Sequence, residues 1–93
     1  MDREEQFRPL KEAISTYLSK PEHLDFIRRA FDYAFDKHSA QLRKSGDPYI
    51  SHPVQVAITL AEYRVDPNTI VAGLLHDILE DTDTDYKEVK QLF

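Results

Sequence analysis

The sequence contains no cysteine and no tryptophan, and only two of its 93 residues are glycine. Without cysteine there is no disulfide, no thiolate zinc site and no cysteine nucleophile, so histidine and carboxylate side chains are the strong metal ligands that remain. Any metal site is therefore expected to suit a harder ion than a thiolate site would. Because glycine is scarce and apolar residues recur at helical rather than alternating spacing, β-strands have little support. The composition predicts an all-α fold.

Long hydrophobic runs and a basic charge balance are also missing. No apolar run approaches the roughly 20 residues that cross a bilayer, and residues 1–5 are too acidic and polar for a secretory signal peptide. We therefore expect a cytoplasmic protein with no membrane partner. The net charge of −5 argues against nucleic-acid binding, because contact with the phosphate backbone requires a basic face.

The apolar residues, at 41% of a chain this short, can furnish one small core, which excludes a second domain. Their spacings of three and four predict about five amphipathic helices. The first has Pro9 near its first turn and ends at residues 19–21, and the second runs from there to about Gln41. The predicted apolar faces of these two helices are formed by Leu10, Ile14, Tyr17, Leu18, Leu24, Ile27, Phe31, Ala34, Phe35 and His38.

The remaining helices follow a loop at residues 43–48, which contains both glycine and proline. Pro53 is predicted as the first residue of a third helix, which is apolar on more than one face and therefore largely buried. Asp66 and Pro67 indicate the cap and first turn of a fourth helix that ends near Leu79. A last helix is expected after the potential caps at residues 82–85.

A cluster of polar side chains at the end of the fourth predicted helix has the spacing of a metal site. His76 and Asp77 are adjacent in an apolar context that we expect to be buried, and directly follow the apolar residues 70–75. Glu80 comes four residues after His76 and Asp81 four after Asp77, so each carboxylate stacks one turn beyond a potential ligand. This pattern suits an ion, its bound water and a neighbouring acid or base. The structural alternative is a solvated helix end.

The three other histidines differ in how well their positions suit metal binding. His52 lies in a short link and is held by Pro53 at the entry of the third helix, where it can face the helical pair, cap the helix or lie in the core. His23 stands among polar residues and is expected to be exposed, whereas His38 lies on an apolar stripe and is expected to be a core histidine. Arg43, Lys44 and Ser45, beside a glycine, suit a phosphate or a stacked base, or form an ordinary solvated turn.

Read together, three motifs in this order closely resemble the hydrolase domain of the RelA/SpoT homologue family. They are RKSGDPYISHP at residues 43–53, the pair Val56 and Ala57, and AGLLHDILEDT at residues 72–82. The resemblance runs from about Leu24 to the end, some three-quarters of the chain. It implies an all-helical member of the HD superfamily that removes the 3′-pyrophosphate of ppGpp and pppGpp, giving GDP or GTP and pyrophosphate, with Mn²⁺.

The resemblance also implies roles for individual residues. His52, His76 and Asp77 match metal ligands for one Mn²⁺ ion, and Glu80 and Asp81 match the acidic pair that supports hydrolysis beside the metal. A divalent ion held by imidazole and carboxylate lowers the pKa of a bound water and offsets charge on phosphoryl oxygens.

The basic segment matches the part of the family that holds the guanine nucleotide, with Arg43 stacking on the base beside Lys44 and Ser45. The family completes its metal site with an aspartate from a helix further downstream, and neither Asp83 nor Asp85 matches it. We therefore expect residues 1–93 to be the N-terminal part of a longer hydrolase domain, with the fourth protein ligand absent from this chain and other domains of a longer parent following. The alternatives are an HD-superfamily phosphohydrolase of another nucleotide, and a non-catalytic helical interaction or regulatory fragment.

Overall fold

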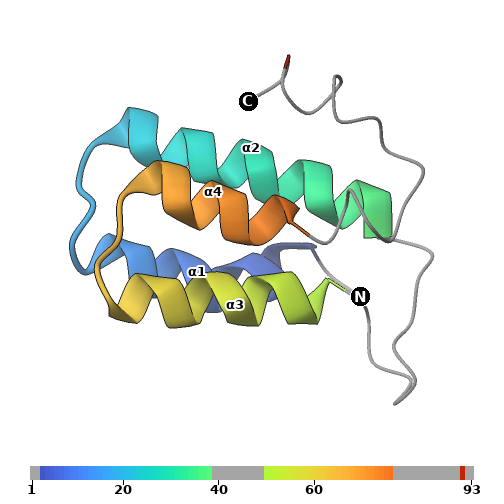
Figure 1. Ribbon diagram of the computed structural model, residues 1–93, viewed down its shortest axis with the longest axis horizontal. Helices are drawn as coiled ribbons and strands as arrows, with labels where there is room; N and C mark the ends of the chain where they lie inside the picture. The colour runs from blue at the N-terminus through green and yellow to red at the C-terminus, as the bar shows by residue number, and fades with distance from the viewer. Residues whose placement is uncertain (1–2, 39–49, 77–90, 92–93) are drawn as a thin grey trace.

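The computed structural model describes residues 3–38, 50–76 and 91. In this part of the chain four α-helices follow one another: α1 (Arg3–Ser15), α2 (Pro21–His38), α3 (Ser51–Glu62) and α4 (Pro67–Leu75) (Figure 1). The predicted all-α fold is confirmed, and none of the described helices is long and apolar enough to cross a membrane. The predicted fifth helix lies outside the described residues, apart from Gln91, which is helical.

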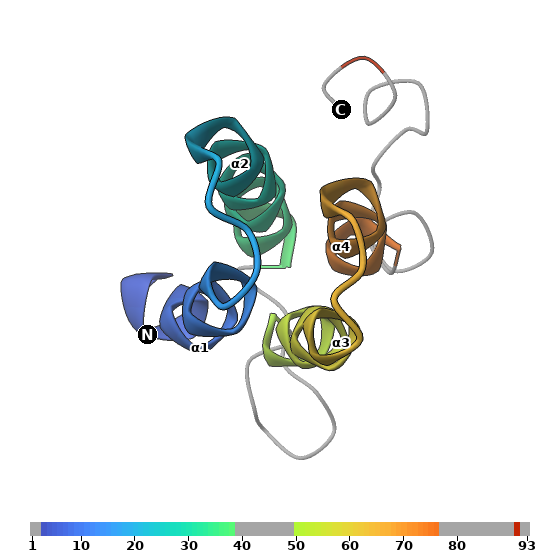
Figure 2. The same ribbon diagram turned by 90° about the vertical axis from the view of Figure 1, so that its left-hand side faces the viewer.

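The four helices form an up-and-down bundle. Seen end-on, α1 lies beside α3 and α2 beside α4, and α3 also packs closely against α4 (Figure 2). Short connections at residues 16–20 and 63–66 lie at one end of the bundle, which we call the turn end. The last residues of α2 and α4 and the first residues of α3 lie at the opposite end (Figure 1). We call it the histidine end, because His38, His52 and His76 occupy those helix ends.

Each helix turns one apolar face into a shared core. Most of the predicted positions are buried, and Leu24, Phe35, Tyr17 and Leu18 pack against the core while partly exposed. Along α2 the spacing of three and four residues continues to His38, so its imidazole is buried too. The fully enclosed large side chains are Leu10, Ile14, Ile27, Phe31, His38, Ile50, Pro53, Ile70 and Leu74.

The start of α1 differs from the prediction, since the helix begins at Arg3 and Pro9 lies inside it. Packing explains the extension. The Phe7 ring is buried, with its centroid 4.9 Å from that of Phe31, and Arg3 donates a hydrogen bond of 3.3 Å to Asp32 on α2. These contacts to α2 hold the first turns helical although Pro9 cannot donate the usual backbone hydrogen bond.

The starts of α3 and α4 agree with the sequence in part. α3 begins two residues earlier than predicted, at Ser51, so Pro53 is its third residue, still within the first turn. Pro67 opens α4 as predicted, after an Asp66 with extended backbone. The Asp66 carboxylate makes no capping bond to the backbone and instead accepts a hydrogen bond from the Thr69 hydroxyl.

Candidate metal and nucleotide site

Two of the predicted ligands lie at the histidine end of the bundle. His52 is the second residue of α3 and is half-buried, and His76 directly follows the last residue of α4. The His76 side chain is exposed, with Nδ1 3.5 Å from the carbonyl oxygen of Gly73. The expectation that His76 shares the burial of the preceding apolar residues is therefore wrong. The face of α4 that enters the core carries Ile70 and Leu74, and residue 76 points well away from that face.

The contact between α3 and α4 sets the heights of the two histidines along the bundle. A Cβ atom added to Gly73 would lie only 2.8 Å from Leu60 Cδ1, so these residues are level with each other in neighbouring antiparallel helices. With a rise of 1.5 Å per residue, His52 lies about 12 Å beyond Leu60, and His76 about 4.5 Å beyond Gly73, in the same direction. The two backbone positions thus differ in height by about 7.5 Å, less than two helical turns.

The other predicted site residues are Arg43, Lys44, Ser45, Asp77, Glu80 and Asp81, and all of them lie outside the described residues. Within residues 3–38, 50–76 and 91, no three histidine or acidic side chains come together in a way that could hold a metal ion. His52 and His76 are therefore the two members of the predicted ligand set that the structure places.

The two remaining histidines lie in different surroundings. His38 is 1% exposed and is the one buried polar or charged side chain in the described part of the chain, which confirms its prediction as a core residue. His23 lies in the first turn of α2, at the turn end, and is half-buried rather than exposed as expected. It is therefore far from His52 and His76 along the bundle.

A shallow hollow beside His52 was missed by sequence reasoning. It encloses about 270 Å³ and follows one face of α3, whose lining residues are His52, Gln55, Val56, Thr59 and Leu60. The lining residues recur at spacings of three and four, which indicates that they share one face of the helix. Because the third helix was expected to be largely buried, this face was not considered as an accessible surface. That expectation is wrong for this face, since Gln55 and Thr59 are exposed. The hollow extends the accessible surface away from His52 along the helix.

Comparison with known proteins identifies the family of the chain. The family model for the HD domain matches residues 30–93, and the chain belongs to this family. It is 52% identical over 85 residues to guanosine-3′,5′-bis(diphosphate) 3′-pyrophosphohydrolase of Aquifex aeolicus (strain VF5), covering 90% of this chain and 12% of the relative.

Two further relatives have related names. The chain is 41% identical over 93 residues to the pyrophosphohydrolase of the same name from Spiroplasma citri, covering all of this chain and 12% of the relative. It is 46% identical over 87 residues to bifunctional (p)ppGpp synthase/hydrolase SpoT of Escherichia coli (strain K12), covering 94% of this chain and 12% of the relative. The chain thus spans about an eighth of the length of these curated relatives. The resemblance to the RelA/SpoT homologue hydrolase domain is confirmed.

Proposed function

We propose that this chain serves the metal-dependent hydrolysis of the 3′-pyrophosphate of ppGpp and pppGpp, which gives GDP or GTP and pyrophosphate. The observation that carries the proposal is the placement of His52 and His76 at one end of an HD-family bundle. Relatives of the chain named for this pyrophosphohydrolase reaction support the choice of substrate.

The proposed metal ligands are His52, His76 and Asp77, and the proposed ion is a single Mn²⁺. Two imidazoles and a carboxylate fit an ion of intermediate hardness, and the chain has no thiolate to draw it toward zinc. The exposed His76 ring and the half-buried His52 ring are both accessible from solvent. When bound, the ion would lower the pKa of a coordinated water and offset negative charge on the phosphoryl oxygens.

The chain's own acidic pair supplies the proton chemistry in this proposal. Glu80 and Asp81 accept a proton from the attacking water and orient it toward the phosphorus, as carboxylates beside a metal site do. Hydrolysis then needs no covalent intermediate with the enzyme.

The proposed nucleotide-holding residues are Arg43, Lys44 and Ser45. A guanidinium is planar and weakly hydrated, so Arg43 can lie over the guanine face while the Lys44 ammonium group pairs with the negative charge of a phosphate. We place the reaction in the cytoplasm because guanine nucleotides are its substrates. We also propose that residues 1–93 form the N-terminal part of the hydrolase domain, and that the remaining metal ligand and the other domains come from elsewhere in a longer protein, since the relatives are about eight times longer.

The test compares the 93-residue chain with a chimera that continues past Phe93 with the corresponding part of the Aquifex aeolicus relative. Bound metal is measured by elemental analysis, and release of pyrophosphate is measured with ppGpp and with a panel of other nucleotides. We expect Mn²⁺-dependent hydrolysis of ppGpp by the chimera. Glu80→Gln should retain the metal but lose at least about 100-fold in turnover, the scale of general acid–base catalysis, whereas His76→Asn should lose both.

Two outcomes would contradict the proposal. In one, the chimera binds metal and hydrolyses another nucleotide but not ppGpp, which leaves an HD phosphohydrolase of different specificity. In the other, Glu80→Gln turns over ppGpp at the rate of the parent chimera, which removes Glu80 from the proton chemistry.

A further inference from the structure

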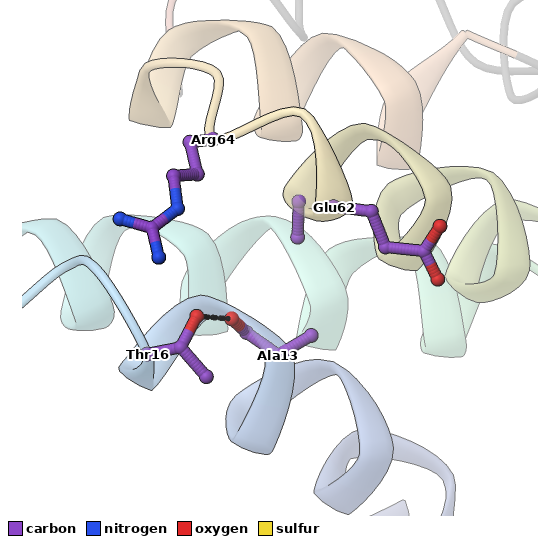
Figure 3. Close-up of a pocket in the computed structure, with 5 residues that line it drawn as sticks. Ala13, Thr16, Glu62 and Arg64 are labelled. Carbon is purple, nitrogen blue, oxygen red and sulfur yellow. Dashed lines mark hydrogen bonds between the residues drawn. The ribbon is translucent and has the colours of Figure 1, made fainter.

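A second hollow lies at the turn end, opposite the histidine end. It encloses about 360 Å³ between the last turns of α1 and α3 (Figure 3). Two alanines are among its lining residues, and the Arg64 side chain extends toward Thr16. Glu62 also lines the hollow but extends away from Arg64 (Figure 3). The hollow thus has a small-residue floor and opposite charges at its rim.

The backbone at Arg64 is unusual for an arginine. Its φ angle is 55°, and it is the one non-glycine residue with a positive φ among the residues that the structure describes. Its backbone N–H closes the end of α3 with a hydrogen bond of 2.9 Å to the carbonyl oxygen of Ala61, a position that usually favours glycine. The chain therefore keeps a long cationic side chain here at a conformational cost.

No side-chain hydrogen bond or ion pair of Arg64 within the described part of the chain offsets this cost. Arg3 and Arg28 each pair with two carboxylates, whereas the Arg64 guanidinium pairs with none of the described residues. A residue held in a sparsely populated conformation, with no side-chain partner among the described residues, suggests that its guanidinium serves a contact beyond them.

Tyr63, the residue before Arg64, carries an exposed aromatic side chain. Tyr63 is 78% exposed and is the one large hydrophobic side chain exposed in the described ranges. It does not line the hollow, although Glu62 and Arg64 on either side of it do. An exposed aromatic residue thus lies next in the chain to the cation and the anion that line the hollow.

We propose that this surface joins two copies of the chain in a symmetric dimer, in which Tyr63 of each copy enters the hollow of the other. The occupant is a second copy because the surface carries its own complement. In a two-fold contact each patch meets itself, so a ring meets a hollow and Arg64 meets Glu62 of the partner subunit, twice. Arg64 then lies near the face of the inserted ring, a favourable cation–π arrangement.

The expected association is weak and reversible. A tyrosine buries about 150–250 Å², so exchanging two of them falls short of the roughly 1,200 Å² typical of stable complexes. We expect a dissociation constant on the order of 0.1 to 1 mM, which is the low-affinity end of the scale. Because the turn end is opposite the histidine end, the dimer leaves the proposed metal site open.

The test is sedimentation velocity of the 93-residue chain from about 10 µM to about 2 mM, a range that brackets this affinity. We expect the weight-average mass to rise toward that of a dimer. Tyr63→Ser should abolish the rise, and Arg64→Glu should weaken association at least about tenfold, as for a lost specific charge contact. Combining Glu62→Arg with Arg64→Glu should restore it, because the two charges exchange places.

Arg8→Glu is the matched control, since Arg8 is exposed, does not line the hollow and undergoes the same change in charge. It should associate like the parent chain, and circular dichroism verifies the fold of each variant. In NMR spectra, dilution should shift the resonances of the Tyr63 ring and of the Ala13 and Ala61 methyl groups. A monomer at every concentration, a dimer that persists in Tyr63→Ser, or equal weakening by Arg8→Glu and Arg64→Glu would each overturn the proposal.

Discussion

At the scale of single residues, Arg64 gives a test that is independent of dimer formation. A β-carbon in the left-handed region costs about 1 to 2 kcal/mol, partly offset by the greater freedom of glycine in the unfolded chain. Arg64→Gly should therefore raise the free energy of unfolding by about 1 kcal/mol. Arg64→Ala is the control, because it keeps the β-carbon and removes only the guanidinium. Urea denaturation in dilute solution measures both, and equal stability of the two variants would show that the φ of 55° is not strained.

The histidines show what a sequence can and cannot establish about single side chains. His38 was predicted to be buried because it continues the stripe of Ile27, Phe31 and Ala34 on one helix face, and it is buried. His76 follows buried residues along the chain, yet it is exposed, because position along a chain does not determine the face of the helix. That His52 and His76 lie at the same end of the bundle depends on the antiparallel pairing of α3 with α4, which no local pattern encodes.

At the scale of elements, the sequence predicted the existence of the four described helices but not all of their boundaries. Proline is favoured in the first turn of a helix, and this local preference correctly predicted that α4 begins at Pro67. For α1 it was wrong, because Phe7 and Arg3 make contacts with α2 that hold the chain helical before Pro9. Those partners lie more than twenty residues away in the sequence, so tertiary packing overrides the local preference.

The position of Pro9 inside α1 leads to a prediction about this helix. Pro9 is exposed, so Pro9→Ala removes no buried contact and restores one backbone N–H donor. An interior proline costs about 3 kcal/mol, and about 0.4–1 kcal/mol of this is offset because proline also restricts the unfolded chain. We therefore expect Pro9→Ala to raise the free energy of unfolding by about 2 to 3 kcal/mol. Glu12→Ala, an exposed change in the same helix, should alter stability by less than about 0.5 kcal/mol. Thermal and urea denaturation would both contradict the prediction if Pro9→Ala were no more stable than the parent chain.

At the scale of the whole molecule, charged groups help attach α1 to the rest of the bundle. The family match covers residues 30–93 and therefore leaves out α1, whose packing on α2 is less extensive than its packing on α3. Arg28, in the part of α2 that also precedes the matched residues, links α2 to α1. It donates to Glu4 on α1 at 3.0 Å and to Asp32 at 3.0 Å, and its guanidinium lies 4.9 Å from the centroid of the Phe7 ring. These contacts of Arg28 stabilise the packing of α1 on α2, which is less extensive than the packing of α1 on α3.

The Glu4–Arg28 pair makes the stability of the bundle depend on pH. The hydrogen bond from Arg28 is the main reason that the pKa of Glu4 lies below its ordinary value of 4.5 in the folded protein. A carboxyl whose pKa is lower in the folded than in the unfolded chain binds fewer protons when folded, so its contribution is present above the unfolded pKa. The contribution is lost as the pH falls through the folded pKa, while Arg28, whose own pKa is raised by Glu4, remains charged throughout.

Glu4→Gln should therefore lower the free energy of unfolding at pH 7, and the difference from the parent chain should vanish as the pH falls below the folded pKa of Glu4. The effect should be small and shrink with added salt, because the Glu4 side chain is 61% exposed. Glu5→Gln is the matched control: it is exposed, lies in the same first turn and removes the same favourable charge at the helix N-terminus. Urea denaturation from pH 7 to about pH 2.5, spanning the titration of carboxyl groups, separates the ion pair from the helix-end effect. If Glu4→Gln and Glu5→Gln lost equal stability at every pH, the support would come from the helix terminus, and Arg28 would not tie α1 to α2 through Glu4.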